Sequence, residues 1–170
     1  MESRRQFLTV VATSLGLAPV VAWLGSPAVA NRVSTTAVEP VFPVRKTAAE
    51  WRSALTPEQY YVLRGHGTER AGSSPLNKEK RRGVFACAGC GRHVFSSDAK
   101  FESGTGWPSF VQPLRDAVGT RVDRSLFMVR TEVHCVGCGG HLGHLFDDGP
   151  RPTGLRYCMN GAALTFTESV

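Results

Sequence analysis

The length, composition and charge of the chain limit its fold and its partners. Its 170 residues suit one domain, and an apolar share of 42% is ordinary for a globular protein. The formal net charge of +6 is spread along the sequence, and the one dense basic cluster lies at residues 78–82. We interpret that cluster as a solvated loop, so nucleic acid is not an expected partner.

The first thirty residues are typical of an export leader. The segment SRRQFL at residues 3–8 resembles the twin-arginine motif, and no charged residue follows it up to Asn31. The run ends in Ala28-Val29-Ala30, a small-x-small pattern that signal peptidases accept. We therefore expect a twin-arginine signal peptide over 1–30, recognised by the export machinery. The mature protein would start at Asn31, in the periplasm or another extracytoplasmic space. An uncleaved membrane anchor is the alternative, and Gly16 and Pro19 within the run disfavour it.

Residues 31–46 carry two prolines and no clear period, so we expect a linker there and a folded domain over 47–170. A helical stretch is predicted over 47–64. Within it Thr56 is a good N-cap, Pro57 occupies the first helical position and Gln59 completes a capping box. Gly65 offers a stop. The side chains expected to pack this helical pair onto the core are Trp51, Leu55, Tyr60 and Leu63.

From Gly83 onward the pattern is that of short strands and turns, after a loop over 65–83. Strands are predicted at 84–86 and 93–95, and polar and apolar residues alternate over 127–133 and 155–167. The sequence therefore predicts a mostly β domain with short helices at its N-terminal edge.

Two matched CxxC pairs indicate a metal site. Cys87 and Cys90 form one pair, Cys135 and Cys138 the other, and each pair has a glycine inside it and a glycine after it. Four thiolates complete a tetrahedral zinc site with no open position, so the metal would be structural and would clamp two distant hairpins. The alternatives are two disulfides, or a redox-active CxxC pair of the thioredoxin kind.

The fifth cysteine, Cys158, stands alone between polar neighbours. If its segment is a strand, Arg156, Cys158 and Asn160 share one face, and a thiol beside a cation is well placed to ionise. An inert core cysteine is the alternative. His141 and His144 follow the second CxxC pair, and proton transfer or hydrogen bonding is favoured for them over metal binding.

Two further segments have a structural and a functional interpretation. Asp147 and Asp148 precede Gly149-Pro150, which indicates a turn. Trp107 lies in a Gly- and Pro-rich loop, where it would serve either core packing or the wall of a small apolar pocket.

Together these segments make the chain similar to the methionine-R-sulfoxide reductase family. The resemblance covers residues 47–167 and includes the helical stretch at 51–70. Its motifs, in order, are the two cysteine pairs, GTGWPSF at 104–110, RTEVHC at 130–135, HLGHLFDDGP at 141–150 and RYCMNGAALTF at 156–166.

The resemblance implies two antiparallel sheets forming a barrel-like core, with a four-cysteine zinc clamp holding one structural Zn²⁺. It implies an enzyme that reduces methionine-R-sulfoxide in oxidised proteins through a cysteine sulfenic acid, and so repairs them. Cys158 would be the nucleophile, and His144 or His141 the acid. The implied roles of the remaining residues are a polar wall for His141, His144 and Asn160, a methyl-binding wall for Trp107, and further substrate contacts for Phe146 and Arg156.

The chain departs from the family pattern in two places. Met159 and Gly161 stand where many members carry Ile or Val and then Ser. Thr105 lies in a loop where some members hold a second, resolving cysteine. With no such cysteine, an external thiol of the thioredoxin-like type is the expected reductant.

Two other functions fit part of the sequence. A zinc-ribbon module that binds nucleic acid or protein would explain the cysteine pairs and the basic charge, but it would leave Cys158 and the leader unexplained. A thiol–disulfide oxidoreductase would use one of the CxxC pairs.

Overall fold

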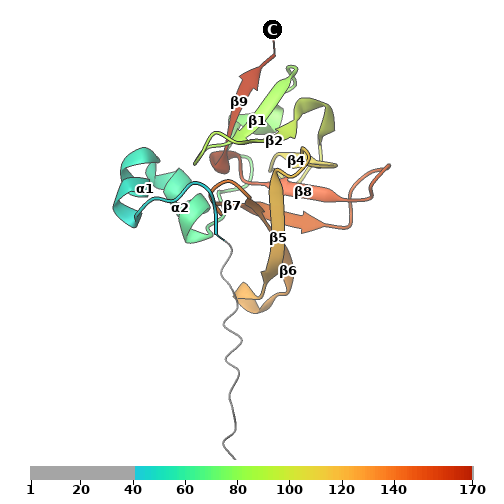
Figure 1. Ribbon diagram of the computed structural model, residues 1–170. Coiled ribbons are helices and arrows are strands. Elements are labelled where there is room, and N and C mark those ends of the chain that lie inside the picture. The colour runs from blue at the N-terminus through green and yellow to red at the C-terminus, as the bar shows by residue number, and fades with distance from the viewer. Residues whose placement is uncertain (1–40, 170) are drawn as a thin grey trace, which may run out of the picture. The chain divides into compact units, whose positions relative to one another are not determined.

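A computed structural model describes residues 41–169 of the chain (Figure 1). The predicted leader and most of the predicted linker lie outside the described residues. Within 41–169, no helix combines the length and the apolar character needed to cross a membrane.

Two short helices open the described part of the chain. Helix α1 spans Ala48–Ala54 and helix α2 spans Pro57–Gly65, and a threonine and its N3 partner form a capping box at the start of each. The predicted cap at Thr56 is therefore confirmed. The predicted stop at Gly65 is one residue early, because His66 takes the left-handed conformation at φ 54° and caps the helix. The Nδ1 atom of His66 lies 3.1 Å from the carboxylate of Glu132, a partner distant in sequence.

A three-stranded antiparallel sheet has the order β2-β1-β9. Its strands are β1 (Gly83–Cys87), β2 (His93–Ser96) and β9 (Leu164–Glu168).

A six-stranded antiparallel sheet has the order β3-β4-β8-β7-β6-β5. Its strands in chain order are β3 (Lys100–Phe101), β4 (Ser109–Phe110), β5 (Val118–Asp123), β6 (Arg130–Cys135), β7 (His141–Phe146) and β8 (Arg156–Met159). The expectation of two antiparallel sheets is confirmed. The pairing within 41–169 leaves β3 and β5 as end strands, so it shows open sheets and no closed barrel.

Two predicted strands have different limits in the structure. The alternation over 127–133 predicted a strand from Phe127, but a 3-10 turn, η3, occupies Ser125–Phe127, and β6 begins at Arg130. The alternation over 155–167 contains two strands, β8 and β9, separated by the 3-10 turn η4 (Gly161–Ala163). The turn lets the chain pass from one sheet to the other, a change that alternation alone does not reveal.

Aromatic packing joins the two sheets. Phe110 of β4 stacks on Phe95 of β2 with ring centroids 4.3 Å apart, and it meets the edge of Phe85 of β1 at 5.0 Å. All three side chains are fully buried. Because β4 pairs directly with β8, this contact also fixes the position of the strand that carries Cys158.

We predict that Phe110→Ala lowers the free energy of unfolding by about 3–5 kcal/mol, since it opens a cavity between the sheets. Urea denaturation followed by circular dichroism measures the loss. The exposed Val41 offers a control, and Val41→Ala should change stability by less than about 0.5 kcal/mol. Equal effects of the two substitutions would contradict this view of the core.

Candidate active site and metal centre

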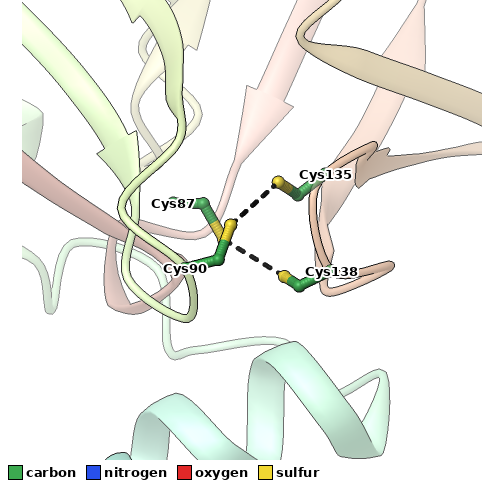
Figure 2. Close-up of side chains that lie close together, drawn as sticks. All are labelled: Cys87, Cys90, Cys135 and Cys138. Carbon is green, nitrogen blue, oxygen red and sulfur yellow. Dashed lines mark hydrogen bonds between the residues drawn. The ribbon is translucent and has the colours of Figure 1, made fainter. Parts of the chain in front are cut away.

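The four paired cysteines come from two turns, one in each sheet, and their thiols lie together. Cys87 and Cys90 belong to the β1–β2 turn, Cys135 and Cys138 to the β6–β7 turn, and Figure 2 shows the two turns presenting their thiols to each other. The sulfur atoms of Cys87 and Cys138 are 3.7 Å apart, and those of Cys90 and Cys135 are 3.5 Å apart. All four sulfur atoms lie within 4.8 Å of one another.

The local backbone explains why each turn brings its two thiols together. Gly91 and Gly139 follow the second cysteine of each turn at φ 73° and 69°, a conformation that favours glycine. Their N–H groups donate to the carbonyls of Cys87 and Cys135, each at 2.8 Å. Both turns therefore have the same construction, although they are far apart in sequence.

This arrangement fits a zinc ion better than the alternatives. Tetrahedral zinc with bonds of about 2.3 Å would place sulfur atoms about 3.8 Å apart, close to the spacing of the two nearest pairs. None of the five cysteines, all within the described residues, forms a disulfide. The sulfur contacts of 3.7 and 3.5 Å both join one turn to the other, as a shared metal requires, whereas a redox CxxC works within one pair.

Cys158 lies in the middle of the six-stranded sheet. In the strand register it stands opposite Ser109 of β4 on one side and His144 of β7 on the other. Directly opposed residues of antiparallel strands place their side chains on the same face, about 4.5–5.5 Å apart at Cβ. The hydroxyl of Thr105 lies 4.0 Å from the Cys158 sulfur.

A small pocket opens beside this thiol. Its volume is about 140 Å³, and its lining is Thr68, Trp107, Arg130, Gly143, His144, Phe146, Cys158 and Asn160. Four larger surface hollows of the described residues, of about 420, 390, 410 and 270 Å³, are lined by neither cysteine nor histidine. The pocket beside Cys158 therefore combines a thiol, an imidazole, an amide and aromatic walls, which is a set that can bind and transform a small polar group flanked by apolar surface.

Asp123 and Arg130 hold His144 in place. The Nε2 atom of His144 lies 2.8 Å from the carboxylate of Asp123, which also pairs with Arg130 at 2.7 Å. A hydrogen bond from the Ser125 backbone and the bond from His144 keep the pKa of Asp123 well below its usual range. Because Asp123 is ionised, Nε2 donates the proton. Burial lowers the pKa of His144, and the bond to Asp123 partly opposes that shift.

Glu69 organises the opposite side of the pocket. Its backbone carbonyl accepts a bond from the Trp107 indole at 3.2 Å, and its backbone N–H donates to Asn160 at 3.0 Å. Its buried carboxylate accepts bonds from the N–H groups of Gly161 and Ala162, each at 2.7 Å. Burial raises the pKa of Glu69, while these two bonds oppose the rise. One residue thus fixes both an aromatic wall and an amide of the pocket.

A second polar network lies behind His144. His141 is buried, and its ring centroid lies 5.2 Å from that of His144. Glu132 accepts from Nδ1 of His141 at 2.8 Å, from Nδ1 of His66 at 3.1 Å, and from Arg121. Burial alone would raise the pKa of Glu132, but these three donors together hold it well below its usual range. The carboxylate is thus fully engaged by side-chain donors.

Arg156 supports the site without lining the pocket. It donates two bonds to the carboxylate of Asp148, each at 2.8 Å, and it stacks over the Phe146 ring at 4.3 Å. Asp148, for which the sequence indicated only a turn, therefore anchors Arg156. Burial raises the pKa of Cys158, and the nearby Arg156 opposes the rise without reversing it. The cation thus lowers the cost of ionising the thiol, which still favours its protonated form.

The structure brings most of the predicted site residues together. Cys158, His144, Asn160, Trp107 and Phe146 line one pocket, and the four zinc-type cysteines form a separate cluster. His141 and Arg156 lie just outside that lining, each one contact away from it.

Several site residues were not predicted from the sequence. They are Glu69, Thr68, Asp123, Arg130 and Glu132. Arg130 and Glu132 fall within the RTEVHC segment, which is one of the motifs of the resemblance. No role was assigned to either residue from the sequence. Thr68 and Glu69 lie near the end of the 51–70 stretch of the resemblance, where they had no assigned role.

Known proteins with similar sequences show the family of this chain. Residues 55–168 match the SelR domain family. A peptide methionine sulfoxide reductase MsrB of Leptospira interrogans is 55% identical over 128 residues, which cover 75% of this chain and 98% of the relative. One of the same name from Methanosarcina mazei is 55% identical over 126 residues, or 74% of this chain and 90% of the relative. The chloroplastic peptide methionine sulfoxide reductase B1 of Arabidopsis thaliana is 55% identical over 116 residues, which cover 68% of this chain and 57% of the relative. The chain therefore belongs to the SelR domain family of peptide methionine sulfoxide reductases.

Proposed function

We propose that Cys158 is the nucleophile of this reductase and that it removes the oxygen of methionine-R-sulfoxide in oxidised proteins as a cysteine sulfenic acid. The observation that supports the proposal best is the strand register, which sets the thiol directly opposite His144 inside the pocket. Enzymes with thiol nucleophiles commonly activate them with an adjacent base.

The first step moves a proton from Cys158 to His144. Burial raises the pKa of the thiol and lowers that of His144, so the resting pair is a neutral thiol and a neutral imidazole. In that neutral imidazole Asp123 holds the proton on Nε2, which leaves Nδ1 free to accept the proton of the thiol. The negative charge of Asp123 stabilises the imidazolium, and Arg156 stabilises the thiolate.

The second step transfers oxygen from substrate to enzyme. The Cys158 thiolate attacks the sulfoxide sulfur, and His144 returns its proton to the sulfoxide oxygen. The hydroxyl then moves from the substrate sulfur to the Cys158 sulfur, as the S–S bond of this adduct and the S–O bond of the substrate both break. Cys158 becomes S–OH, and methionine leaves in its reduced form. The enzyme thiol is oxidised by two electrons and the sulfoxide is reduced by two. We assign the acid role to His144 because it lines the pocket, whereas His141 lies behind it.

Two equivalents of an external thiol restore the enzyme. The first forms a mixed disulfide with Cys158 and releases water, and the second releases the thiol of Cys158 together with an external disulfide. The side chains that contact the Cys158 sulfur include Thr105 and Ser109, and a hydroxyl cannot form a disulfide. The other four cysteines are gathered between the turns. A protein of the thioredoxin-like type is the proposed reductant.

The pocket walls support selection of one sulfur configuration. Trp107 and Phe146 provide apolar contacts for the S-methyl group, and His144 and Asn160 provide polar contacts for the oxygen. With oxygen and methyl on these walls and the methylene chain directed out of the pocket, three of the four positions around the tetrahedral sulfur are set. Only one configuration then presents its sulfur to Cys158.

We propose that Cys87, Cys90, Cys135 and Cys138 bind one structural zinc ion per chain. The closed set of four sulfur donors supports this assignment. The ion would offset two of the four negative charges of these thiolates and hold the β1–β2 turn to the β6–β7 turn. None of these cysteines lines the pocket of Cys158, so the ion would take no part in the chemistry.

We also propose that the protein acts outside the cytoplasm. The twin-arginine motif and the alanine-rich cleavage pattern of residues 1–30 support export. Export of an already folded protein suits a domain whose zinc ligands must be loaded during folding.

The function is tested with dabsylated methionine sulfoxide of each configuration and dithiothreitol as reductant. We expect turnover of the R form alone. Cys158→Ser should reduce kcat at least about a thousandfold, because it removes the nucleophile. His144→Asn should reduce kcat about a hundredfold or more, while the exposed His93→Asn serves as its control. Full turnover by Cys158→Ser, or equal turnover of both forms, would contradict the scheme.

Zinc binding is tested by metal analysis and thiol titration. The purified protein should contain one zinc ion per chain and show one reactive thiol, Cys158, whereas chelator treatment should expose all five. Chelation should also lower the melting temperature by on the order of 10 °C or more, because metal binding contributes to folding. A Cys158→Ser variant, as control, should keep its zinc. Absence of zinc together with two disulfides would overturn the assignment.

The leader is tested on the exported protein. Mass analysis should find a mature N-terminus at Asn31, and replacing Arg4 and Arg5 by Lys should leave the protein in the cytoplasm. Recovery of the intact N-terminus from the extracytoplasmic fraction would contradict cleavage after Ala30.

A further inference from the structure

Exposed apolar side chains are concentrated on the β5–β6 hairpin. Among the described side chains, four of the six large apolar ones with high exposure are there, and the other two are Val41 and Tyr61. The four are Val122, Phe127, Met128 and Val129. The hairpin extends away from the three-stranded sheet (Figure 1). Apolar residues gathered at one exposed place are characteristic of an interaction surface.

Phe127 is the least expected residue of this group. Its backbone has φ 58°, in the left-handed region that bulky side chains rarely adopt. Its side chain is fully exposed, so it adds nothing to the core. The backbone conformation is unfavourable for this residue type, and the side chain packs against nothing in the core. A contact with another molecule best explains such a residue.

A hollow of about 410 Å³ lies at the base of the same hairpin. Its apolar lining comes from Val122, Val129, Leu145, Leu155 and Phe146, and its other lining residues are Arg130, Thr131 and Asp147. The positive charge of Arg130 is paired with the carboxylate of Asp123, and Asp147 adds a single negative charge. The hollow therefore carries no strong charge of one sign. Apolar contact is therefore the main attraction that this surface offers.

The hollow adjoins the catalytic pocket. Arg130 and Phe146 line both of them. The pocket beside Cys158 has about 140 Å³, which accommodates one side chain and not its neighbours in a polypeptide. Successive residues of an extended chain advance by about 3.3 Å, so residues flanking a sulfoxide in the pocket reach past Phe146 into the hollow.

We propose that this hollow and the exposed apolar residues of the β5–β6 hairpin dock the apolar polypeptide segment that carries the methionine sulfoxide. The proposal rests on the proposed function of the pocket, and it names the substrate class: oxidised methionine in apolar, unfolded or exposed segments rather than in polar ones. Val129 and Phe127 would contact the residues next to the sulfoxide.

Short peptides test the proposal with dithiothreitol as reductant, so that no protein reductant takes part. One peptide has methionine-R-sulfoxide between leucines, a second has it between serines, and N-acetyl-methionine-R-sulfoxide has no neighbours. The variants are Phe127→Asn, which suits a left-handed backbone, and Val129→Thr, which keeps the side-chain shape. Val41→Thr is the matched control, because Val41 is 70% exposed and Val129 is 72% exposed.

We expect the wild type to have a lower KM for the leucine peptide than for the serine peptide. Each hairpin variant should raise the KM for the leucine peptide by about fivefold or more with kcat unchanged. The KM values for the serine peptide and for N-acetyl-methionine sulfoxide should stay at wild-type levels, as should every value of Val41→Thr. Melting temperatures no lower than that of the wild type would show that the variants fold.

Several results would overturn the proposal. An unchanged KM for the leucine peptide in both folded variants excludes substrate docking, and a raised KM for thioredoxin in the same variants would then assign the surface to the reductant. A change in sedimentation mass with unchanged KM would assign it to a second copy of the chain. Failure of the proposed function itself is distinct, because the wild type would then turn over none of the three substrates.

Discussion

The meeting of two turns from different sheets is the constraint on which the rest of the structure depends. The β1–β2 turn belongs to the three-stranded sheet and the β6–β7 turn to the six-stranded sheet, and each brings two buried or half-buried thiols to the same point. The second turn leads directly into β7, the strand of His144. A metal ion bound there would fix the start of β7, and the packing of Phe110 on Phe95 fixes β4 and, through it, β8. Cys158 and His144 are therefore positioned by contacts that lie outside the pocket.

Two buried carboxylates and one half-buried carboxylate complete the site at a cost in desolvation. Glu69, Asp123 and Glu132 each accept several hydrogen bonds, and each fixes a different part of the pocket or its surroundings. Removing one partner from such a group leaves an uncompensated charge, so these networks hold a single arrangement. Burial raises the pKa of Cys158, so the proposed nucleophile is kept as a thiol until a base acts on it. This protects Cys158 from oxidants that react with free thiolates, which suits an enzyme meant to repair oxidised proteins.

Much of this site could be predicted from the sequence because its signals are local. The spacing of the cysteine pairs, the glycines after them and the alternation around Cys158 all act over a few residues. Thr56 and its capping box could be identified for the same reason. The pairing of His144 with Asp123 could not, since it depends on the register of β5, β6 and β7 together. Nor could the left-handed cap at His66, because the glycine before it was the stronger local signal.

The separation of β8 from β9 shows the same limit. Alternation continues across η4, and only packing against two different sheets reveals the break. Likewise, the polar neighbours of Cys158 indicated a ready thiolate, whereas burial of the sulfur raises its pKa despite the nearby Arg156. The charged neighbours of Cys158 can be read from the sequence, whereas the burial of its sulfur cannot.

A single turnover without reductant tests the central claim most directly. The reduced, zinc-loaded protein is mixed with an excess of methionine-R-sulfoxide, the methionine formed is counted, and the protein is digested for mass analysis. The account predicts one methionine per chain and one added oxygen atom on the peptide that contains Cys158, trapped as its sulfenic acid. Methionine formed with Cys158 unmodified, or with oxidation of Cys87, Cys90, Cys135 or Cys138 instead, would contradict it.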